Sequence, residues 1–187
     1  MTDKLLNHMI KRNIINEEDV EIYRFGLEAL KLKMFHYVSY LLIAIFCDGV
    51  AEFLLFFIAF VLLRKSAGGY HAKTKGGCYV LSCLTVILAI AIMKNITMEN
   101  TTLVVGVLLL IIADIVIFRL APLGNRNREL EYEEEKYFRK KTILLLILEN
   151  ISVLLLIWVN KEQHALSFVL AIVCQAILLL LQKGNDI

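Results

Sequence analysis

A histidine and a cysteine lie in the segment of this chain where glycines, charges and the start of an apolar run meet. The segment reads RKSAGGYHAKTKGGC and extends from Arg64 to Cys78, with His71 at its centre. Because the apolar run begins at Tyr79, Cys78 is predicted to lie in the first turn of a helix. A helix N-terminus and nearby positive charge favour a thiolate. A cysteine beside an imidazole is a minimal activated nucleophile for acyl transfer.

The glycines of this segment give its backbone the freedom that such a site requires. A glycine pair just before Cys78 lets the chain turn back toward His71, and Gly68 and Gly69 allow either close backbone approach to a substrate or an oxyanion site. A lone His-x6-Cys spacing in a membrane protein is more often incidental than catalytic, so the spacing alone leaves both interpretations open. No other His or Cys clusters with the pair, so neither a metal nor another cofactor is predicted.

The composition identifies the surroundings of this segment. Hydrophobic residues make up 59% of the 187, and the mean hydropathy is +0.70. Soluble domains are about 45–50% apolar, so a soluble globule is excluded. A single proline and nine glycines argue against a disordered chain. The four cysteines contain no CxxC pair and suggest no disulfide framework.

Six apolar segments of about 14 to 17 residues follow one another along the chain. They cover residues 34–47, 49–63, 79–93, 103–118, 143–159 and 165–181. Each is shorter than the roughly 20 residues of a perpendicular membrane-spanning helix, a difference that flanking residues or local thinning of the bilayer can cover. We predict an all-α integral membrane protein with about six short transmembrane helices. The first two segments could instead form a re-entrant hairpin, although two full spans are favoured.

The distribution of Lys and Arg predicts the orientation. If all six segments cross, every basic residue except Lys94 and Lys161 falls on the side of the N-terminus. Cytoplasmic loops carry the excess of positive charge. Both termini and the two most basic loops are therefore expected in the cytoplasm, and the hairpin alternative keeps the same sidedness. This topology already explains the basic loops, so no nucleic-acid partner is predicted.

The first 33 residues are predicted to form a separate element within a single polytopic membrane domain, 1–187. Asn16 and the acidic residues after it are typical of a helix start. From Val20 to Met34, apolar residues recur on one helical face. We expect residues 1–33 to form an amphipathic helix at the cytoplasmic interface and residues 34–187 to form the transmembrane bundle. A role as a cap or in a coiled coil is an equally good interpretation of this segment.

Two carboxylates lie inside apolar segments, where an ionised group is costly. Asp114 belongs to the fourth segment and Glu149 to the fifth. Either could orient His71 as a third catalytic group, because a general base usually has an orienting partner. Interhelical hydrogen bonding or a neutral acid is the more common role for such residues.

The loop motif resembles the signature of the accessory gene regulator protein B (AgrB) family. Its residues in this chain are Arg64, Gly68, Gly69, His71, Ala72 and Cys78. A second, looser similarity is Ala121-Pro122-Leu123 with the basic residues Arg126 and Arg128, where the acidic run 129–135 departs from the family pattern. In layout the resemblance covers essentially the whole chain, but in residues only these two loops.

The resemblance implies a membrane cysteine endopeptidase of the bacterial cell membrane. By this likeness, His71 acts as base and Cys78 attacks the scissile carbonyl of a short AgrD-like signalling propeptide. The acyl-thioester is then resolved by a Cys or Ser side chain of the substrate, which gives a cyclic thiolactone or lactone. Arg64, Gly68, Gly69, Arg126 and Arg128 are expected to support the site, Arg64 by pairing with a substrate carboxylate. A homodimer in the lipid bilayer is also implied.

Two other classes of function compete with a peptidase. A small transporter or exporter would place polar residues and broken helices near the midplane, often in paired halves. Here the conspicuous cluster lies at the predicted cytoplasmic edge, and no internal repeat is visible. A non-catalytic membrane scaffold would make Cys78 a packing residue only.

Overall fold

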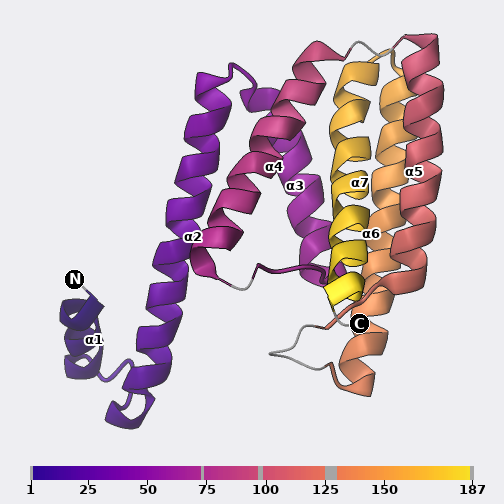
Figure 1. Ribbon diagram of the computed structural model, residues 1–187. Helices are drawn as coiled ribbons and strands as arrows, with labels where there is room; N and C mark the ends of the chain where they lie inside the picture. Colours follow the sequence, from indigo (N-terminus) through magenta and orange to yellow (C-terminus); the bar gives the residue numbers. More distant parts are fainter. Residues whose placement is uncertain (1, 73, 97–98, 125–129, 186–187) are drawn as a thin grey trace. The chain divides into compact units, whose positions relative to one another are not determined.

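The computed structural model describes residues 2–72, 74–96, 99–124 and 130–185 (Figure 1). In this part of the chain the regular elements are helices, together with an isolated bridge between Gly68 and Leu123. The all-α class is thus confirmed. The chain divides into two compact units, Met1–Leu42 and Ile43–Ile187, which are described separately.

The first unit contains helix α1, Thr2–Lys11, a 3-10 turn at Glu17–Asp19 and the first part of α2, Val20–Phe46. Its buried hydrophobic side chains are Leu6, Ile15 and Tyr40. The predicted helix start after Asn16 lies at the 3-10 turn. No helix end is present at residue 33, because the polar first half of α2 continues without proline into the apolar second half. The amphipathic segment and the first apolar segment therefore share one helix.

The second unit is a bundle arranged around the C-terminal helix. It comprises α3 (Val50–Ala67), α4 (Lys75–Asn95), α5 (Asn100–Leu120), α6 (Tyr132–Trp158) and α7 (Glu162–Asn185). Helix α7 contacts α3, α4, α5 and α6 (Figure 1). Its buried positions include several alanines and a serine. Small side chains let the neighbouring helices approach closely, as is common in membrane bundles.

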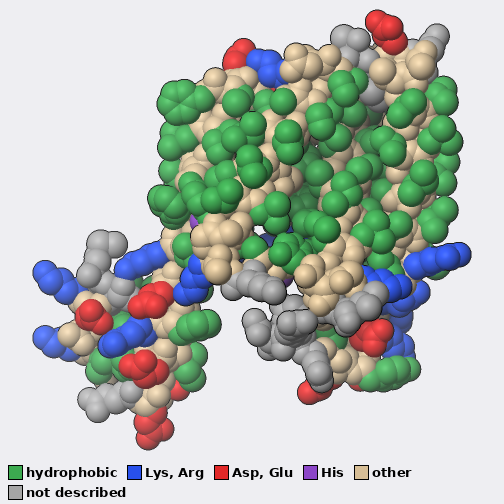
Figure 2. All heavy atoms as spheres, in the orientation of Figure 1, with side chains coloured by type: hydrophobic (Ala, Val, Ile, Leu, Met, Phe, Trp, Pro, Cys, Tyr) green, Lys and Arg blue, Asp and Glu red, His purple; other side chains and the backbone are tan. Residues whose placement is uncertain are grey.

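Five of the described helices are long and apolar enough to cross a membrane: α2, α4, α5, α6 and α7. Helix α3 is not among the five, because its 18 residues include three charged ones, Glu52, Arg64 and Lys65. Figure 2 shows the corresponding surface, with hydrophobic side chains over the bundle and Lys and Arg around one end of it. The prediction of about six helices at these positions is confirmed, and α2 and α3 are separate long helices.

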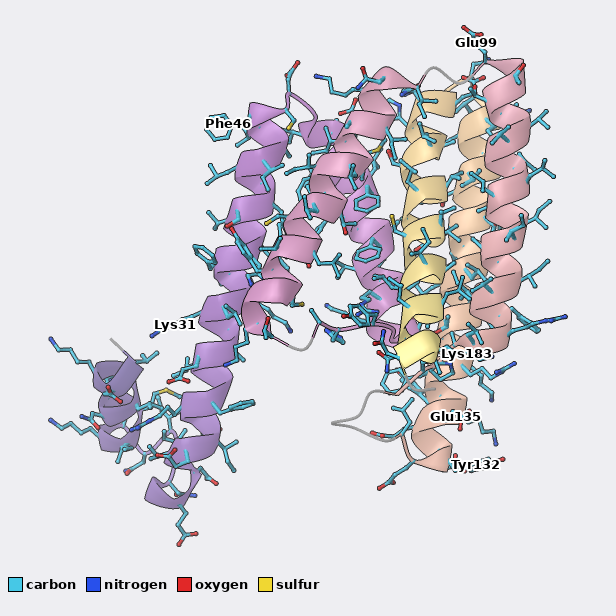
Figure 3. The ribbon with its side chains drawn as sticks, in the orientation of Figure 1. Lys31, Phe46, Glu99, Tyr132, Glu135 and Lys183 are labelled. Atoms are coloured by element: carbon cyan, nitrogen blue, oxygen red, sulfur yellow. The ribbon has the colours of Figure 1, made fainter. Side chains whose placement is uncertain are left out.

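The loops of the second unit meet at two opposite ends. The segments after α3 and α5 meet where α7 ends, since Leu123 N donates to Ala67 O at 3.0 Å and Tyr70 N donates to Leu178 O at 2.9 Å. At the other end, Lys94 Nζ donates to Cys47 O at 2.9 Å. Figure 3 shows this separation, with Lys183 of α7 and Glu135 of α6 far from Glu99.

Candidate active site

Cys78 lies in the first turn of α4, as predicted. Thr74 caps this helix, because its side chain accepts a hydrogen bond from Gly77 N at 3.0 Å. Cys78 N donates to Thr74 O at 3.0 Å, so the thiol-bearing residue makes the first backbone bond of the helix. The Cys78 side chain is half-buried. The positive end of the helix dipole is therefore close to the thiol and favours a negative charge there.

The glycine pair after α3 is required by the backbone. Gly68 and Gly69 have φ angles of +74° and +119°, in the region that L-residues rarely adopt. A Cβ atom on Gly68 would overlap the carbonyl oxygen of Leu123, and one on Gly69 would overlap the guanidinium of Arg64. These glycines let the chain pass close to two neighbours. Their described role is thus to shape the loop that carries His71.

Arg64 holds this loop from the last turn of α3. Its Nη1 donates to Gly68 O at 2.6 Å, and its Nη2 donates to Tyr70 O. The guanidinium fork therefore binds two backbone carbonyls on the N-terminal side of His71. The sequence predicted a salt bridge between Arg64 and a substrate, and that role stays a prediction. In the structure the side chain anchors the loop.

Arg64 also acts electrostatically on both residues of the predicted pair. Its charge interacts with Cys78 and with His71. Partial burial, and then the Arg64 charge, lower the pKa of His71 below its usual value of 6.5. The imidazole is accordingly neutral near pH 7, as a general base must be. Among the described contacts His71 and Cys78 make no direct hydrogen bond. Such bonds are often long before substrate binds.

Helix α7 contributes to the same loop, a contact that the sequence reasoning missed. Gln175 Nε2 donates to Gly68 O at 2.9 Å, and Leu178 O accepts from Tyr70 N. Gln175 has no exposed surface. An amide in the middle of an apolar run was the available signal, because burying one is unfavourable unless it is hydrogen-bonded.

The two loops that carry the family resemblance lie against each other. Leu123 N donates to Ala67 O at 3.0 Å, and the bridge between Leu123 and Gly68 runs parallel. Arg139 lies over the ring of Phe118 at 5.6 Å and so covers the end of α5. Arg126 and Arg128 fall outside the described residues. The Ala121-Pro122-Leu123 segment thus forms one wall of the glycine turn.

The two carboxyl groups inside apolar helices, the half-buried Asp114 and the buried Glu149, lie apart from this loop. Asp114 Oδ1 accepts a hydrogen bond from Asn150 Nδ2 at 3.2 Å, and Glu149 is buried close enough to interact electrostatically with Asp114. Among the described residues neither carboxylate contacts His71. Asp114 precedes Ala121 by seven residues, which is about 10 Å of helix. An orienting role for Asp114 or Glu149 stays a prediction. The described residues contain no group of three or more His, Cys, Asp or Glu that could hold a metal ion.

Comparison with known proteins identifies the family. The sequence model of "Accessory gene regulator B" matches residues 2–179. The chain belongs to the AgrB family. The match includes both loops described above, the helices α3 to α6, and α7 as far as residue 179.

Individual AgrB relatives are distant but cover most of the chain. An AgrB-like protein of Clostridium perfringens (strain SM101) is 25% identical over 94% of this chain and 88% of its own length. The accessory gene regulator protein B of Staphylococcus aureus (strain JH9) is 26% identical over 95% of this chain and 91% of its own length. AgrB-like protein 2 of Clostridium perfringens (strain 13) is 26% identical over 75% of this chain and 70% of its own length. No solved structure matches this chain.

Proposed function

We propose that this AgrB-family protein is a membrane cysteine endopeptidase of accessory gene regulator quorum sensing. Its substrate is a short AgrD-like precursor, from which it removes the C-terminal part. The observation that carries the proposal is the placement of His71 and Cys78 on one ordered segment. Cys78 lies in the first turn of the capped helix α4, and Arg64 binds the Gly68 and Tyr70 carbonyls directly before His71. A nucleophile and its base need such a common, ordered setting.

The reaction proceeds in two acyl transfers. His71 accepts the thiol proton of Cys78, and the sulfur forms a bond to the scissile carbonyl carbon. The C–N bond then breaks, and the imidazolium returns its proton to the leaving amine, which leaves an acyl-thioester on Cys78. A Cys or Ser side chain of the precursor then gives its proton to His71 and attacks the thioester carbonyl. The bond to the Cys78 sulfur breaks, the sulfur takes the proton back from His71, and a thiolactone or lactone ring closes. Exclusion of water and a substrate nucleophile held nearby favour ring closure over hydrolysis.

The site is proposed to face the cytoplasm from a bacterial cell membrane. Lys and Arg gather at the end of the second unit where α7 ends (Figure 2). Lys94 and Lys161 belong to the opposite end, because Lys94 binds Cys47 O after α2 and Lys161 lies in the turn between α6 and the start of α7. Positively charged loops remain in the cytoplasm. In intact cells, an impermeant thiol reagent should therefore label single-cysteine chains at Cys47 and spare those at Cys78. The reverse pattern would invert the proposed orientation.

The deciding experiment co-expresses this chain with the short peptide encoded nearest to it and detects the shortened precursor by mass. Cys78→Ala and His71→Ala are compared with the unaltered chain at matched membrane levels. Cys83→Ala is the matched control, because Cys83 is a second half-buried cysteine on the same helix. We expect the product to fall below detection in the first two variants and to persist in the control.

A transporter is the second candidate, and the carboxyl pair of half-buried Asp114 and buried Glu149 is the observation that favours it. Carboxylates inside a membrane bundle often mark ion or substrate pathways. Undiminished precursor cleavage in both Cys78→Ala and His71→Ala would reject the peptidase. If Asp114→Asn and Glu149→Gln then reduced export of the peptide, the transporter would take its place.

A further inference from the structure

Gln175 is a fully buried amide on the apolar face of α7. Its side chain has no exposed surface, and its Nε2 lies 2.9 Å from the carbonyl oxygen of Gly68. A carbonyl can only accept, so the amide nitrogen must be the atom that faces it. This leaves the Gln175 Oε1 atom buried without a partner among the described residues. An apolar residue would avoid that cost, so the amide needs a reason to be present.

The Gly68 carbonyl connects two helices through one acceptor. It receives Nη1 of Arg64 from α3 at 2.6 Å and Nε2 of Gln175 from α7. Two residues later, Tyr70 is bound on both sides, because its carbonyl accepts from Arg64 and its N–H donates to Leu178 O. The loop segment directly before His71 is therefore fixed from both helices.

We infer that Gln175 is a positioning residue, which fixes the loop of His71 through the Gly68 carbonyl and so sets the place of the imidazole relative to Arg64 and Cys78. The inference rests on the proposed peptidase function but can be tested apart from it. Without Gln175, Arg64 would still hold the loop from α3, and the backbone bond from Tyr70 N to Leu178 O would remain the tie to α7. Gln175 ties the loop to a different helix, at the centre of the bundle.

Loss of this bond has a defined consequence for His71. Partial burial and the Arg64 charge both act on His71 and lower the pKa of its imidazole. If the loop loosens, the imidazole gains water and moves away from Arg64. Both changes raise the pKa of His71 toward the ordinary 6.5. A change that merely weakened the bundle would leave the histidine environment of the folded protein as it was.

The test uses Gln175→Met, which keeps length and volume but removes the donor. Gln163→Met is the matched control, because Gln163 lies on the same helix and donates to Met93 O and Ile96 O at its other end. Full-length protein in membranes is treated with diethylpyrocarbonate across a pH series, and modification of each histidine is followed by mass. The reagent reacts with neutral imidazole. When the modification rate of each histidine is divided by its own plateau at high pH, the midpoint of the curve reports protonation and does not depend on how easily the reagent reaches the ring.

We expect the His71 midpoint to move to higher pH in Gln175→Met and to stay in place in Gln163→Met. His8, His36 and His164 serve as internal references in every sample. In the cleavage assay, Gln175→Met should lower the rate at saturating precursor between about tenfold and a hundredfold. Gln175→Asn, whose amide is one methylene shorter, should behave like Gln175→Met.

The outcomes separate this inference from the proposed function. An unchanged His71 midpoint in Gln175→Met, or an equal shift in Gln163→Met, overturns the positioning role. A shifted midpoint in a chain whose unaltered form cleaves no precursor leaves the positioning role standing and removes the peptidase. A shifted midpoint together with slower cleavage supports both.

Discussion

Two polar regions of the bundle differ in how many of their buried hydrogen-bonding groups have a partner. In the loop between α3 and α4, the carbonyls of Gly68 and Tyr70 are bound by Arg64, and Gln175 adds a further donor. Between α5 and α6, Glu149 is 5% exposed, and both of its carboxyl oxygens are buried without a partner among the described residues.

The first region is held in one geometry by hydrogen bonds, whereas the second contains a carboxyl group without a hydrogen-bond partner among the described residues. Several donors converging on two carbonyls fix the geometry of the loop, whereas an unpaired carboxyl in an apolar bundle is costly unless it is protonated and often marks a functional position. The loop is therefore the better place for catalysis that depends on geometry. The carboxyl pair is the place where substitution can increase stability.

The largest effect is expected for Arg64→Met, which removes the donors to Gly68 and Tyr70 while keeping much of the side chain. Displacing a catalytic group by about 1 Å can cost roughly a hundredfold in rate, and cleavage should fall by at least that factor. Lys65→Met is the control, because Lys65 is the exposed neighbour in the same helical turn. Precursor cleavage at matched membrane levels measures both. An equal loss of cleavage in the two variants would contradict the role of Arg64 in holding the loop.

Gly69→Ala should have the next largest effect. Its φ of +119° and the overlap with Arg64 both resist a side chain. Strain of this kind costs about 1–3 kcal/mol, so cleavage should drop roughly tenfold or more. Gly76→Ala is the matched control, since nothing lies within 4 Å of a Cβ there. It should leave cleavage unchanged and stabilise the start of α4 by about 0.5–1 kcal/mol. Tolerance of alanine at Gly69 would contradict the described turn.

Glu149→Leu tests the other region and should change stability in the opposite direction. Removing an unpaired buried carboxyl should raise the free energy of unfolding by about 1–3 kcal/mol. Asn150→Leu, at the next position of α6, should lower it, because Asp114 then loses its hydrogen-bond donor. Thermal unfolding in detergent measures both variants. A loss of cleavage in a stable Glu149→Leu protein would instead give this carboxyl a role in the reaction.

The smallest expected effect is on the pH profile. His71 must be neutral to accept a proton, and its pKa is lowered from 6.5 by partial burial and by Arg64. Cleavage is therefore expected to persist as the pH falls to 6.5 and to be lost only below it. Initial rates of cleavage in membrane vesicles across pH 5 to about 8 measure this acidic limb. A midpoint above 6.5 would indicate that His71 is not the base or that its loop opens during turnover.

Much of the site followed from local sequence. Cys78 was predicted in the first turn of a helix, and the structure has it there because Thr74 caps α4 directly before the apolar run. The glycine pair after Arg64 likewise indicated a turn, and in the structure both glycines have positive φ angles that other residues rarely adopt. The contact of Leu123 with Gly68 and the bond from Gln175 were not predicted, since each joins residues far apart in the chain. The periodicity of a segment predicts its local structure but does not indicate which distant backbone group its side chains will contact.

The sequence by itself determined that this is a helical membrane protein, where its long helices lie and which loop carries the histidine and cysteine. These features depend on apolar content, helix caps and glycine, all of which act over a few residues. Only the tertiary structure decided that Arg64 binds the loop backbone, that α7 holds the same loop, and that the carboxyl pair lies apart from it. Those outcomes depend on how α3, α4, α5 and α6 pack around α7, which brings together atoms more than a hundred residues apart.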